Sequence, residues 1–385
     1  MKELLLLWLA GASLRLTLLA IPPIIPQLRS EFALSQAGIG ALTSFSVLLF
    51  AFAAIPGSLL VSRMGALRVV TLGLFVTAIG GAVRGLSPDV AALFATTFAM
   101  GLGTAIMQPA LPAVVREWMP AHRVALGTAT YSNGLLVGEA ISASLTIPVV
   151  LPMVHGNWRW SLVAWSAPVL LVALAFLRPA VAHHAQARAA TSRRWWPDWH
   201  DPLTWGVGIL AGYASALYYS TNAFLPGLVA ARGRPELLNP ALSALNWMQL
   251  PASFLVMAYS ARFTMRRAPF VAAQAVSLAG IAGLVMLPAD AIVVCAGVTG
   301  FCNAFLLVLT LAMPPLMAKP EDIHRLSAAM MLVGYVCAFV VPIAGGAAWD
   351  ATHAPAMAFA PLLAFGVLAL VVAARVRLAR YRRPA

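Results

Sequence analysis

The sequence predicts an all-α polytopic membrane protein with twelve transmembrane helices arranged in two pseudo-symmetric six-helix bundles. Of its 385 residues, 61% are hydrophobic and only 10% are charged, whereas a soluble domain carries roughly 25% charged residues. Apolar stretches long enough to cross a bilayer, about 20 residues each, recur along the whole chain. The composition therefore excludes a soluble enzyme, a secreted disulfide scaffold and a nucleic-acid-binding domain.

Charges and turn residues divide the apolar stretches into two sets of six. The first set comprises residues 4–26, 38–62, 67–86, 89–115, 123–151 and 160–178, and the second comprises 202–230, 240–261, 268–287, 289–317, 323–349 and 354–376. The longest polar interval, residues 179–201, separates them. We therefore expect an N-terminal bundle (1–178), a linker (179–201) and a C-terminal bundle (202–385) that ends in a short basic tail.

The distribution of basic residues predicts the orientation. The net charge is +13, and if the N-terminus is cytoplasmic, nineteen basic residues fall on that side. Only four fall on the other side, namely Arg29, Arg159, Arg232 and Arg234. Cytoplasmic loops of membrane proteins accumulate Lys and Arg, so both termini and the linker are expected in the cytoplasm. Abundant alanine and only two lysines indicate a GC-rich bacterial genome, hence a bacterial inner membrane.

The two halves resemble each other at a spacing of about 200 residues. Arg63 and Arg68 follow the second stretch, as Arg262 and Arg267 follow the eighth. Two related bundles imply a binding site between them near the midplane, which suits alternating access. The sequence contains no GxxxxGK[ST] loop, so ATP is not expected to drive the process directly.

Cysteine and histidine positions predict neither a metal site nor a cofactor. The three cysteines lie in apolar stretches without a CxxC spacing, and every histidine falls in a loop or in the linker. No HExxH sequence, Ser/Lys dyad or pair of intramembrane carboxylates supports catalysis. A membrane-embedded enzyme or receptor is therefore a weaker hypothesis than a transporter.

Arg15 is the main candidate for contact with a substrate. It lies about halfway along the first apolar stretch, where an ionised side chain costs at least about 2.5–3.5 kcal/mol on insertion scales. Its planar guanidinium suits carboxylate-like anions and keeps its proton. We expect an anion contact or a fixed counter-charge. The alternative is a structural ion pair with a buried acid.

Glu139 is the acidic residue that lies deepest within a predicted span. Its carboxylate predicts a proton-coupling site or a cation contact, or else the structural partner of Arg15. The interpretations are compatible, because an anion can compete with Glu139 for Arg15.

Arg84, near the end of the third stretch, is expected to extend toward the membrane interface. Alternatively, it belongs to an electropositive ring that attracts anions.

Other polar residues in the spans are candidates for the cavity. Gln108 shares a helical face with Thr97, Gly101 and Thr104, which favours a cavity over an interhelical hydrogen bond. In the second half, Tyr218 and Asn222 are one turn apart, although tyrosines near span ends also form interfacial belts. The further candidates for substrate binding are Asn246, Asn303 and Tyr335.

The loop between the second and third stretches resembles the signature of the major facilitator superfamily, roughly G-x-L-x-D-R-x-G-R. The loop offers Leu60, Arg63, Gly65 and Arg68, with Gly57 displaced by one position and Ser62 in place of the usual Asp, so the signature is degenerate. The resemblance covers essentially the whole chain and implies the major facilitator fold, a monomer without cofactors, and a gating or conformational role for Arg63, Gly65 and Arg68.

Within this superfamily the chain is most similar to the branch of cyanate and 2-nitroimidazole transporters. The segments that carry this similarity include residues 11–15, 26–28, 80–84 and 212–215. An arginine early in the first span is typical of the branch, and Arg15 matches it, although Leu16 takes the place of the proline that usually follows.

We therefore expect a secondary transporter in the lipid bilayer, with a small-molecule substrate and no nucleic-acid partner. The leading hypothesis is transport of a small anion of cyanate or carboxylate type. Arg15 would contact the anion, and Glu139 would couple transport to protons. The alternative is a proton-driven exporter of neutral or weakly basic heteroaromatic compounds, which Trp247 and Tyr218 would hold.

Overall fold

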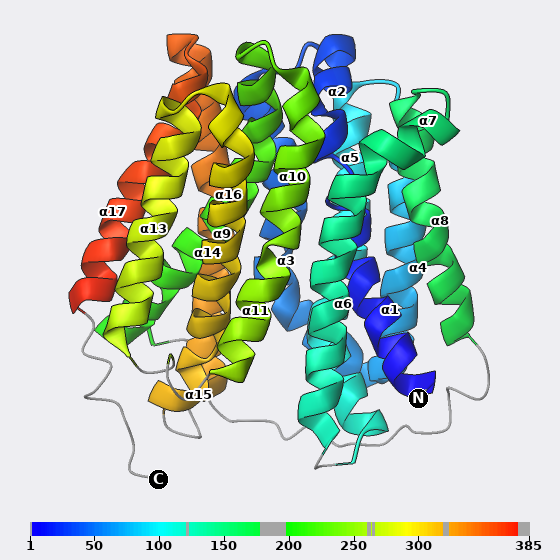
Figure 1. Ribbon diagram of the computed structural model, residues 1–385. Coiled ribbons are helices and arrows are strands. Elements are labelled where there is room, and N and C mark those ends of the chain that lie inside the picture. Colours follow the sequence, from blue (N-terminus) through cyan, green and yellow to red (C-terminus); the bar gives the residue numbers. More distant parts are fainter. Residues whose placement is uncertain are drawn as a thin grey trace. The chain divides into compact units, whose positions relative to one another are not determined.

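A computed structural model of the chain describes residues 2–120, 123–177, 198–259, 263, 266–318 and 323–375 (Figure 1). These residues form helices joined by short loops, without a strand among them. Most of the predicted linker, residues 179–201, lies outside the described residues. The chain divides into two compact units, one of Met1–Leu34 with Phe45–Ala190 and the other of Ser35–Ser44 with Thr191–Ala385. The domain boundaries predicted above stay a prediction.

The helices follow the predicted apolar stretches. The first part of the chain contains α1 (Lys2–Leu16), α2 (Ile25–Phe32), α3 (Gln36–Met64), α4 (Ala66–Arg84), α5 (Val90–Trp118), α6 (Val124–Leu145), α7 (Leu151–Met153) and α8 (Trp158–Phe176). The second part contains α9 (Pro202–Ala231), α10 (Leu238–Trp247), α11 (Gln249–Ala258), α13 (Arg267–Met286), α14 (Ile292–Leu311), α15 (Met313–Met317), α16 (Ile323–Thr352) and α17 (Ala360–Arg375).

Within the described residues, eight helical runs are long and apolar enough to cross a membrane. The other four predicted stretches are also helical, but each lacks either the helix length or the hydropathy of these eight runs. Residues 4–26 and 240–261 are interrupted, and α3 contributes a described apolar run of Gln36–Phe52. The helix α9 is 30 residues long, but its tyrosine, serine, threonine and asparagine side chains lower its mean hydropathy.

The expectation of one continuous helix over residues 4–26 is wrong. The helix α1 ends at Leu16, a turn follows, and a 3-10 helix at Pro22–Ile24 leads into α2. Pro22 and Pro23 carry no backbone N–H and obstruct the helix before them, so an α-helix cannot continue through this point. The first predicted span is therefore discontinuous, and its carbonyl groups need other partners.

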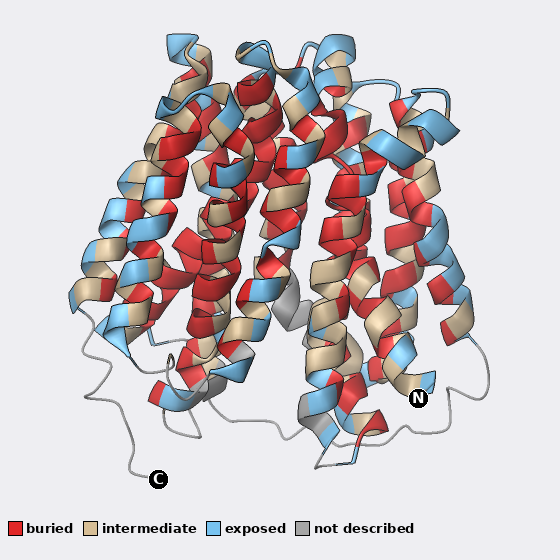
Figure 2. Ribbon diagram, viewed as in Figure 1, coloured by how far each residue is buried: buried red, intermediate tan, exposed pale blue. Residues whose placement is uncertain are grey.

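Equivalent helices pack together in each unit, as the internal repeat predicts. In the first unit α1 packs on α6, and α4 packs on α5 and α8; in the second, α9 packs on α16, and α13 packs on α14 and α17. Glycines mark equivalent contacts, since Gly80 meets Met100 of α5 and Gly280 meets Thr299 of α14. Figure 2 shows α9 almost entirely buried, while α13 and α17 carry many exposed residues.

The contact between α1 and α6 is a close approach of two backbones. A Cβ atom at Gly134 would lie 2.1 Å from the Trp8 carbonyl oxygen, and one at Gly138 would lie 2.4 Å from the Ala12 carbonyl oxygen. The two glycines form a GxxxG sequence on α6, the pattern that lets helices in lipid approach closely. Any larger side chain at these positions would separate the helices.

We predict that Gly138→Ala lowers the thermal unfolding midpoint of the purified protein. The added methyl group would press on the Ala12 backbone, and overpacking of this kind costs about 1–3 kcal/mol. Gly334→Ala in α16 is the matched control, because its nearest neighbour lies 3.6 Å from the new atom. That variant should unfold at the same or a higher temperature. Equal midpoints for the two variants would contradict the proposed backbone contact.

Outside the membrane spans, Glu31 connects α2 to α8. Its carboxylate accepts hydrogen bonds from the Trp158 indole (2.6 Å) and the Arg159 guanidinium (2.5 Å). The Arg159 guanidinium also donates to the Ser87 carbonyl oxygen at 2.5 Å. The hydrogen bonds from Trp158 and Arg159 hold the pKa of Glu31 below its ordinary value of 4.5.

This depressed pKa predicts how stability changes with pH. A carboxyl group whose folded-state pKa is below its unfolded value stabilises the fold above the unfolded pKa, and this contribution disappears as the pH falls through the folded pKa. Wild type should therefore unfold at a higher temperature than Glu31→Gln near neutral pH. The difference between the two midpoints should shrink once the pH falls below 4.5. A difference that stays constant with pH would show that Glu31 does not contribute as a carboxylate.

Candidate functional site

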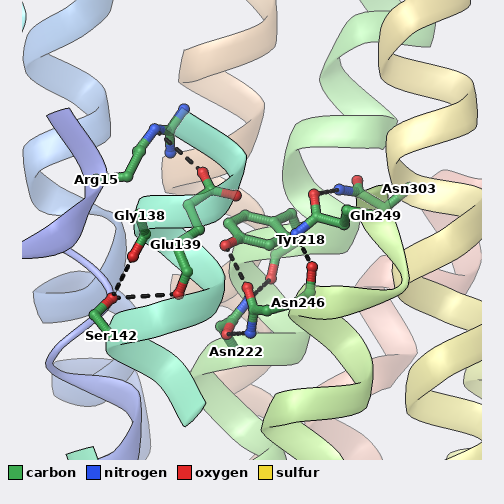
Figure 3. Close-up of polar contacts among 9 residues, drawn as sticks. All are labelled: Arg15, Gly138, Glu139, Ser142, Tyr218, Asn222, Asn246, Gln249 and Asn303. Atoms are coloured by element: carbon green, nitrogen blue, oxygen red, sulfur yellow. Dashed lines mark hydrogen bonds and ion pairs between the residues drawn. The ribbon is translucent and has the colours of Figure 1, made fainter. Parts of the chain in front are cut away.

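The structure brings Arg15 and Glu139 together. Figure 3 shows the two side chains pointing toward each other from α1 and α6, with Arg15 Nε 3.3 Å from Glu139 Oε1. Their side chains are 11% and 4% exposed, so the ion pair is largely shielded from solvent. Gly11, Gly134 and Gly138 set the close helix spacing that makes this reach possible. Each predicted residue is therefore next to the partner that its charge requires.

The surroundings of Arg15 combine an aromatic face with a helix end. The guanidinium carbon lies 5.6 Å from the centre of the buried Phe50 ring, within the range of a cation–π interaction. Arg15 also lies in the last turn of α1, where the partial negative charge of the helix dipole favours a cation. Its carbonyl oxygen accepts from both Leu18 N (3.1 Å) and Leu19 N (3.0 Å). The cation thus lies where the first helix breaks.

Arg84 lies beside the same helix break, and the expectation that it extends toward the membrane interface is wrong. The residue is 1% exposed, and its Nη2 donates to the Thr17 carbonyl oxygen at 2.6 Å. That carbonyl oxygen lies just beyond the end of α1. Gly81, one turn before Arg84, packs on both α8 and this turn, since a Cβ there would lie 2.6 Å from Ser166 Oγ and 3.4 Å from Thr17 Cγ2. Arg84 therefore holds the broken end of the first helix.

In the second unit, uncharged polar side chains form a chain of hydrogen bonds (Figure 3). The Tyr218 hydroxyl donates to Asn246 Oδ1 at 2.7 Å, and Asn246 Nδ2 lies 3.4 Å from Asn222 Oδ1. Asn303 Nδ2 donates to Gln249 Oε1 at 3.3 Å. These residues come from α9, α10, α11 and α14. All five are buried, at 0–5% exposure, so the helices of this unit meet at a polar centre.

The polar centre surrounds a second helix break. The predicted span 240–261 is divided at Met248, between α10 and α11. Asn246 and Gln249 lie on either side of the break, and Gln249 Nε2 lies 3.5 Å from the Asn246 carbonyl oxygen. Interrupted helices with polar neighbours are typical of transporter binding sites. The break therefore draws attention to Gln249, which the sequence analysis did not select.

Asn303 contributes a hydrogen-bond acceptor without a partner. Among the described residues, no donor reaches its Oδ1 atom, although the residue is only 2% exposed. Buried polar atoms in proteins are nearly always hydrogen-bonded. An N–H or O–H group on a bound molecule would satisfy this oxygen, which makes Asn303 a suitable substrate contact.

The contacts described above do not include the remaining predicted residues. Gln108 in α5 and Tyr335 in α16 are partly exposed. Arg63 and Arg68 are exposed on either side of the turn between α3 and α4. Gly65 forms that turn with a φ of +87°, a conformation that L side chains rarely adopt. Gly65 thus has a structural reason for its place, and the gating role of the loop stays a prediction.

Comparison with known proteins identifies the family. The sequence profile of the Major Facilitator Superfamily matches residues 7–245. The chain belongs to this superfamily. The match confirms the predicted fold of two six-helix bundles and places this facilitator among multi-pass membrane transporters, not enzymes.

Its curated relatives include two transporters of Escherichia coli. The cyanate transport protein is 28% identical over 342 residues, which cover 88% of each chain. The 2-nitroimidazole transporter is 27% identical over 368 residues, 94% of this chain and 91% of that protein. An uncharacterised transporter of Bacillus subtilis is 26% identical over 355 residues, 91% of this chain and 87% of that protein.

Solved structures support the fold. A bacterial homologue of the human lysosomal transporter Spinster, in an inward-facing and unoccupied conformation, matches this facilitator with a TM-score of 0.77. It is 16% identical, and the match covers 100% of this chain and 98% of that one. The nucleoside transporter NupG matches with a TM-score of 0.75 at 13% identity, over 97% of each chain. At these identities the likeness concerns architecture alone.

We predict that the Arg15–Glu139 pair stabilises the protein only as a pair. Removing one partner from a buried ion pair leaves an uncompensated charge and typically costs about 3–5 kcal/mol. Arg15→Met and Glu139→Met should each lower the thermal unfolding midpoint, while the double variant should lose much less than the sum of the two. Arg15→Met combined with Glu31→Gln is the control, and its effects should add. Additive effects at Arg15 and Glu139 would refute the coupling.

Proposed function

We propose that this facilitator transports a small anion of cyanate or carboxylate type, with Arg15 as the anion contact. The buried Arg15–Glu139 ion pair at the broken end of α1 carries the proposal. An arginine presents a planar group of N–H donors that matches a planar anion and keeps its charge throughout. The relation to a cyanate transport protein over 88% of each chain agrees with this substrate class.

In the proposed cycle the substrate competes with Glu139 for Arg15. When the anion binds Arg15, Glu139 becomes a buried carboxylate without a counter-charge, and uptake of a proton removes that charge. Release of the substrate then restores the ion pair and expels the proton. The anion and the proton would therefore move together, as an electroneutral symport.

The bundles of residues 1–178 and 202–385 would alternate in access to the two sides of the membrane. Arg63, Gly65 and Arg68 would act as a conformational element between α3 and α4. Gln108, Asn222, Asn246, Asn303, Tyr218 and Tyr335 would complete the substrate contacts. The distribution of basic residues supports cytoplasmic termini, and the alanine-rich composition with only two lysines supports a bacterial inner membrane. We propose a monomer as the working unit.

A second function follows from the polar centre of the second unit. Tyr218, Asn222, Asn246, Gln249 and Asn303 offer hydrogen bonds without a formal charge. Such a set suits a neutral or weakly basic heteroaromatic compound better than a free anion. In that case the protein would export the compound in exchange for protons, with Glu139 as their carrier and Arg15 as its structural partner.

We predict that Arg15→Lys sharply reduces uptake of cyanate or a small carboxylate into proteoliposomes, because lysine keeps the charge but loses the planar donor group. Arg375→Lys, at the exposed end of α17, is the matched control and should transport normally. Glu139→Gln should retain exchange of labelled for unlabelled anion but lose acceleration by a proton gradient. Unchanged uptake in Arg15→Lys would refute the anion contact.

Ligand-dependent thermal stability separates the two functions. A ligand at 100 times its dissociation constant stabilises the folded protein by about 2.7 kcal/mol. Stabilisation by an anion in wild type, lost in Arg15→Ala, would support the first function. Stabilisation by 2-nitroimidazole alone, retained in Arg15→Ala, would instead support export of heteroaromatic compounds.

A further inference from the structure

The second unit contains an apolar groove that neither proposed function uses. It lies among α11, α13 and α14 and has a volume of about 870 Å³. Its lining residues are apolar except for one cation, and they include Met248, Ala272, Val276, Phe301 and Phe305. Arg266 is that cation. The groove therefore suits a molecule with a long apolar part and one anionic group.

The lining residues of α13 define the length of the groove. They recur at helical spacing from Ala268 to Val276, on one face of the first half of α13. Arg266 precedes the first residue of the helix. At 1.5 Å per residue, the ten residues from Arg266 to Val276 span about 15 Å. This distance is half of the roughly 30 Å hydrocarbon core of a bilayer, so the groove extends across a single leaflet.

The groove is open along this length. Val276 in α13 is 47% exposed, and Met248, at the break between α10 and α11, is 40% exposed, although both are large apolar residues. Ala272 is also exposed, and its small side chain leaves space above α14. Phe301 and Phe305 of α14 stack on each other with ring centres 6.3 Å apart and form part of the groove wall. An acyl chain lying in this groove would cover the exposed apolar side chains.

Arg266 places a positive charge at the end of the groove where α13 begins. Its side chain is exposed, and no described residue forms an ion pair or hydrogen bond with its guanidinium. Arg267 follows it directly and adds a second positive charge at the same end. Basic side chains next to a membrane span attract anionic lipid headgroups. The charge and the apolar lining thus match the two parts of an anionic phospholipid.

We propose that the groove binds one anionic phospholipid from the leaflet in which α13 begins. Its phosphate pairs with Arg266, and one acyl chain lies along α13 between Ala268 and Val276, against Phe301 and Phe305. This lipid site is independent of the transported substrate, so it stands whichever proposed function is correct.

The test measures lipid binding to the purified full-length protein by native mass spectrometry. The probes are dioleoylphosphatidylglycerol, which is anionic, and dioleoylphosphatidylcholine, which is zwitterionic; glycerol phosphate serves as a headgroup without acyl chains. Arg266→Gln removes the charge, and Ala272→Trp fills the groove. Arg375→Gln, at the exposed end of α17, and Ala279→Trp, two turns further along α13, are matched controls. All four positions are exposed, so folding should survive each change.

We expect wild type to bind phosphatidylglycerol more tightly than phosphatidylcholine. Arg266→Gln should weaken phosphatidylglycerol binding about fivefold, the effect of about one juxtamembrane charge. It should weaken phosphatidylcholine binding less, because the choline cation of that lipid already offsets the charge of its phosphate. Ala272→Trp should weaken binding of both lipids, and the controls should match wild type.

Equal binding of the two lipids to wild type would indicate non-selective contact with the bilayer and overturn the proposal. Equal effects of Arg266→Gln and Arg375→Gln would also overturn it. Competition by glycerol phosphate as strong as that by the intact lipid would point to a simple phosphate site, which would likewise reject the groove as a lipid site. Dimer formation that Ala272→Trp abolishes, without any lipid selectivity, would assign the groove to a second copy of the chain.

Discussion

The charged part of the candidate site depends on the close approach of α1 and α6. Gly134 and Gly138 let the α6 backbone contact the carbonyl groups of Trp8 and Ala12. Directly beside this contact the side chains of Arg15 and Glu139 meet. Without a hydrophobic driving force between helices in lipid, such contacts rest on packing and on polar interactions. The glycines therefore do more than fill a tight space, because the helix spacing they set keeps the Arg15 guanidinium within reach of the Glu139 carboxylate.

The two units hold polar groups inside the membrane by different means. The first uses full charges next to a helix break, with Arg15 paired to Glu139 and Arg84 bound to the Thr17 carbonyl oxygen. The second uses amides and a phenol around the break at Met248. A carbonyl oxygen freed by a helix break must accept a hydrogen bond within the protein. The repeat gives the two units the same helix packing, but the side chains that lie near each break differ with the local sequence. The pairing of equivalent helices is thus the same, while the chemistry at the two breaks differs.

Much of this arrangement could be predicted from the sequence. Charged residues in apolar stretches are conspicuous, so Arg15 and Glu139 were both selected, and their pairing was one of the expected alternatives. Arg84 was misjudged because its distance from the end of the helix does not reveal what surrounds it. Phe50 has no signal within a long apolar stretch. Pro22 and Pro23 announce the first helix break, and Pro251 announces the second, because it has no N–H for the Trp247 carbonyl at the end of α10. The candidates chosen from the sequence include Asn246 on one side of this break but not Gln249 on the other.

The position of the two buried arginines along the chain has a consequence for biogenesis. The chain is synthesised from its N-terminus, so the Thr17 carbonyl group already exists when Arg84 enters the membrane within α4. Arg15 is in the opposite situation, because α1 must be inserted before the ribosome has made α6 and its Glu139. During that interval the first helix carries an unmatched cation, at a cost of at least about 2.5 kcal/mol on insertion scales. Arrival of α6 ends this penalty, which makes docking of the fifth predicted span the step that commits the N-terminal unit to its folded arrangement.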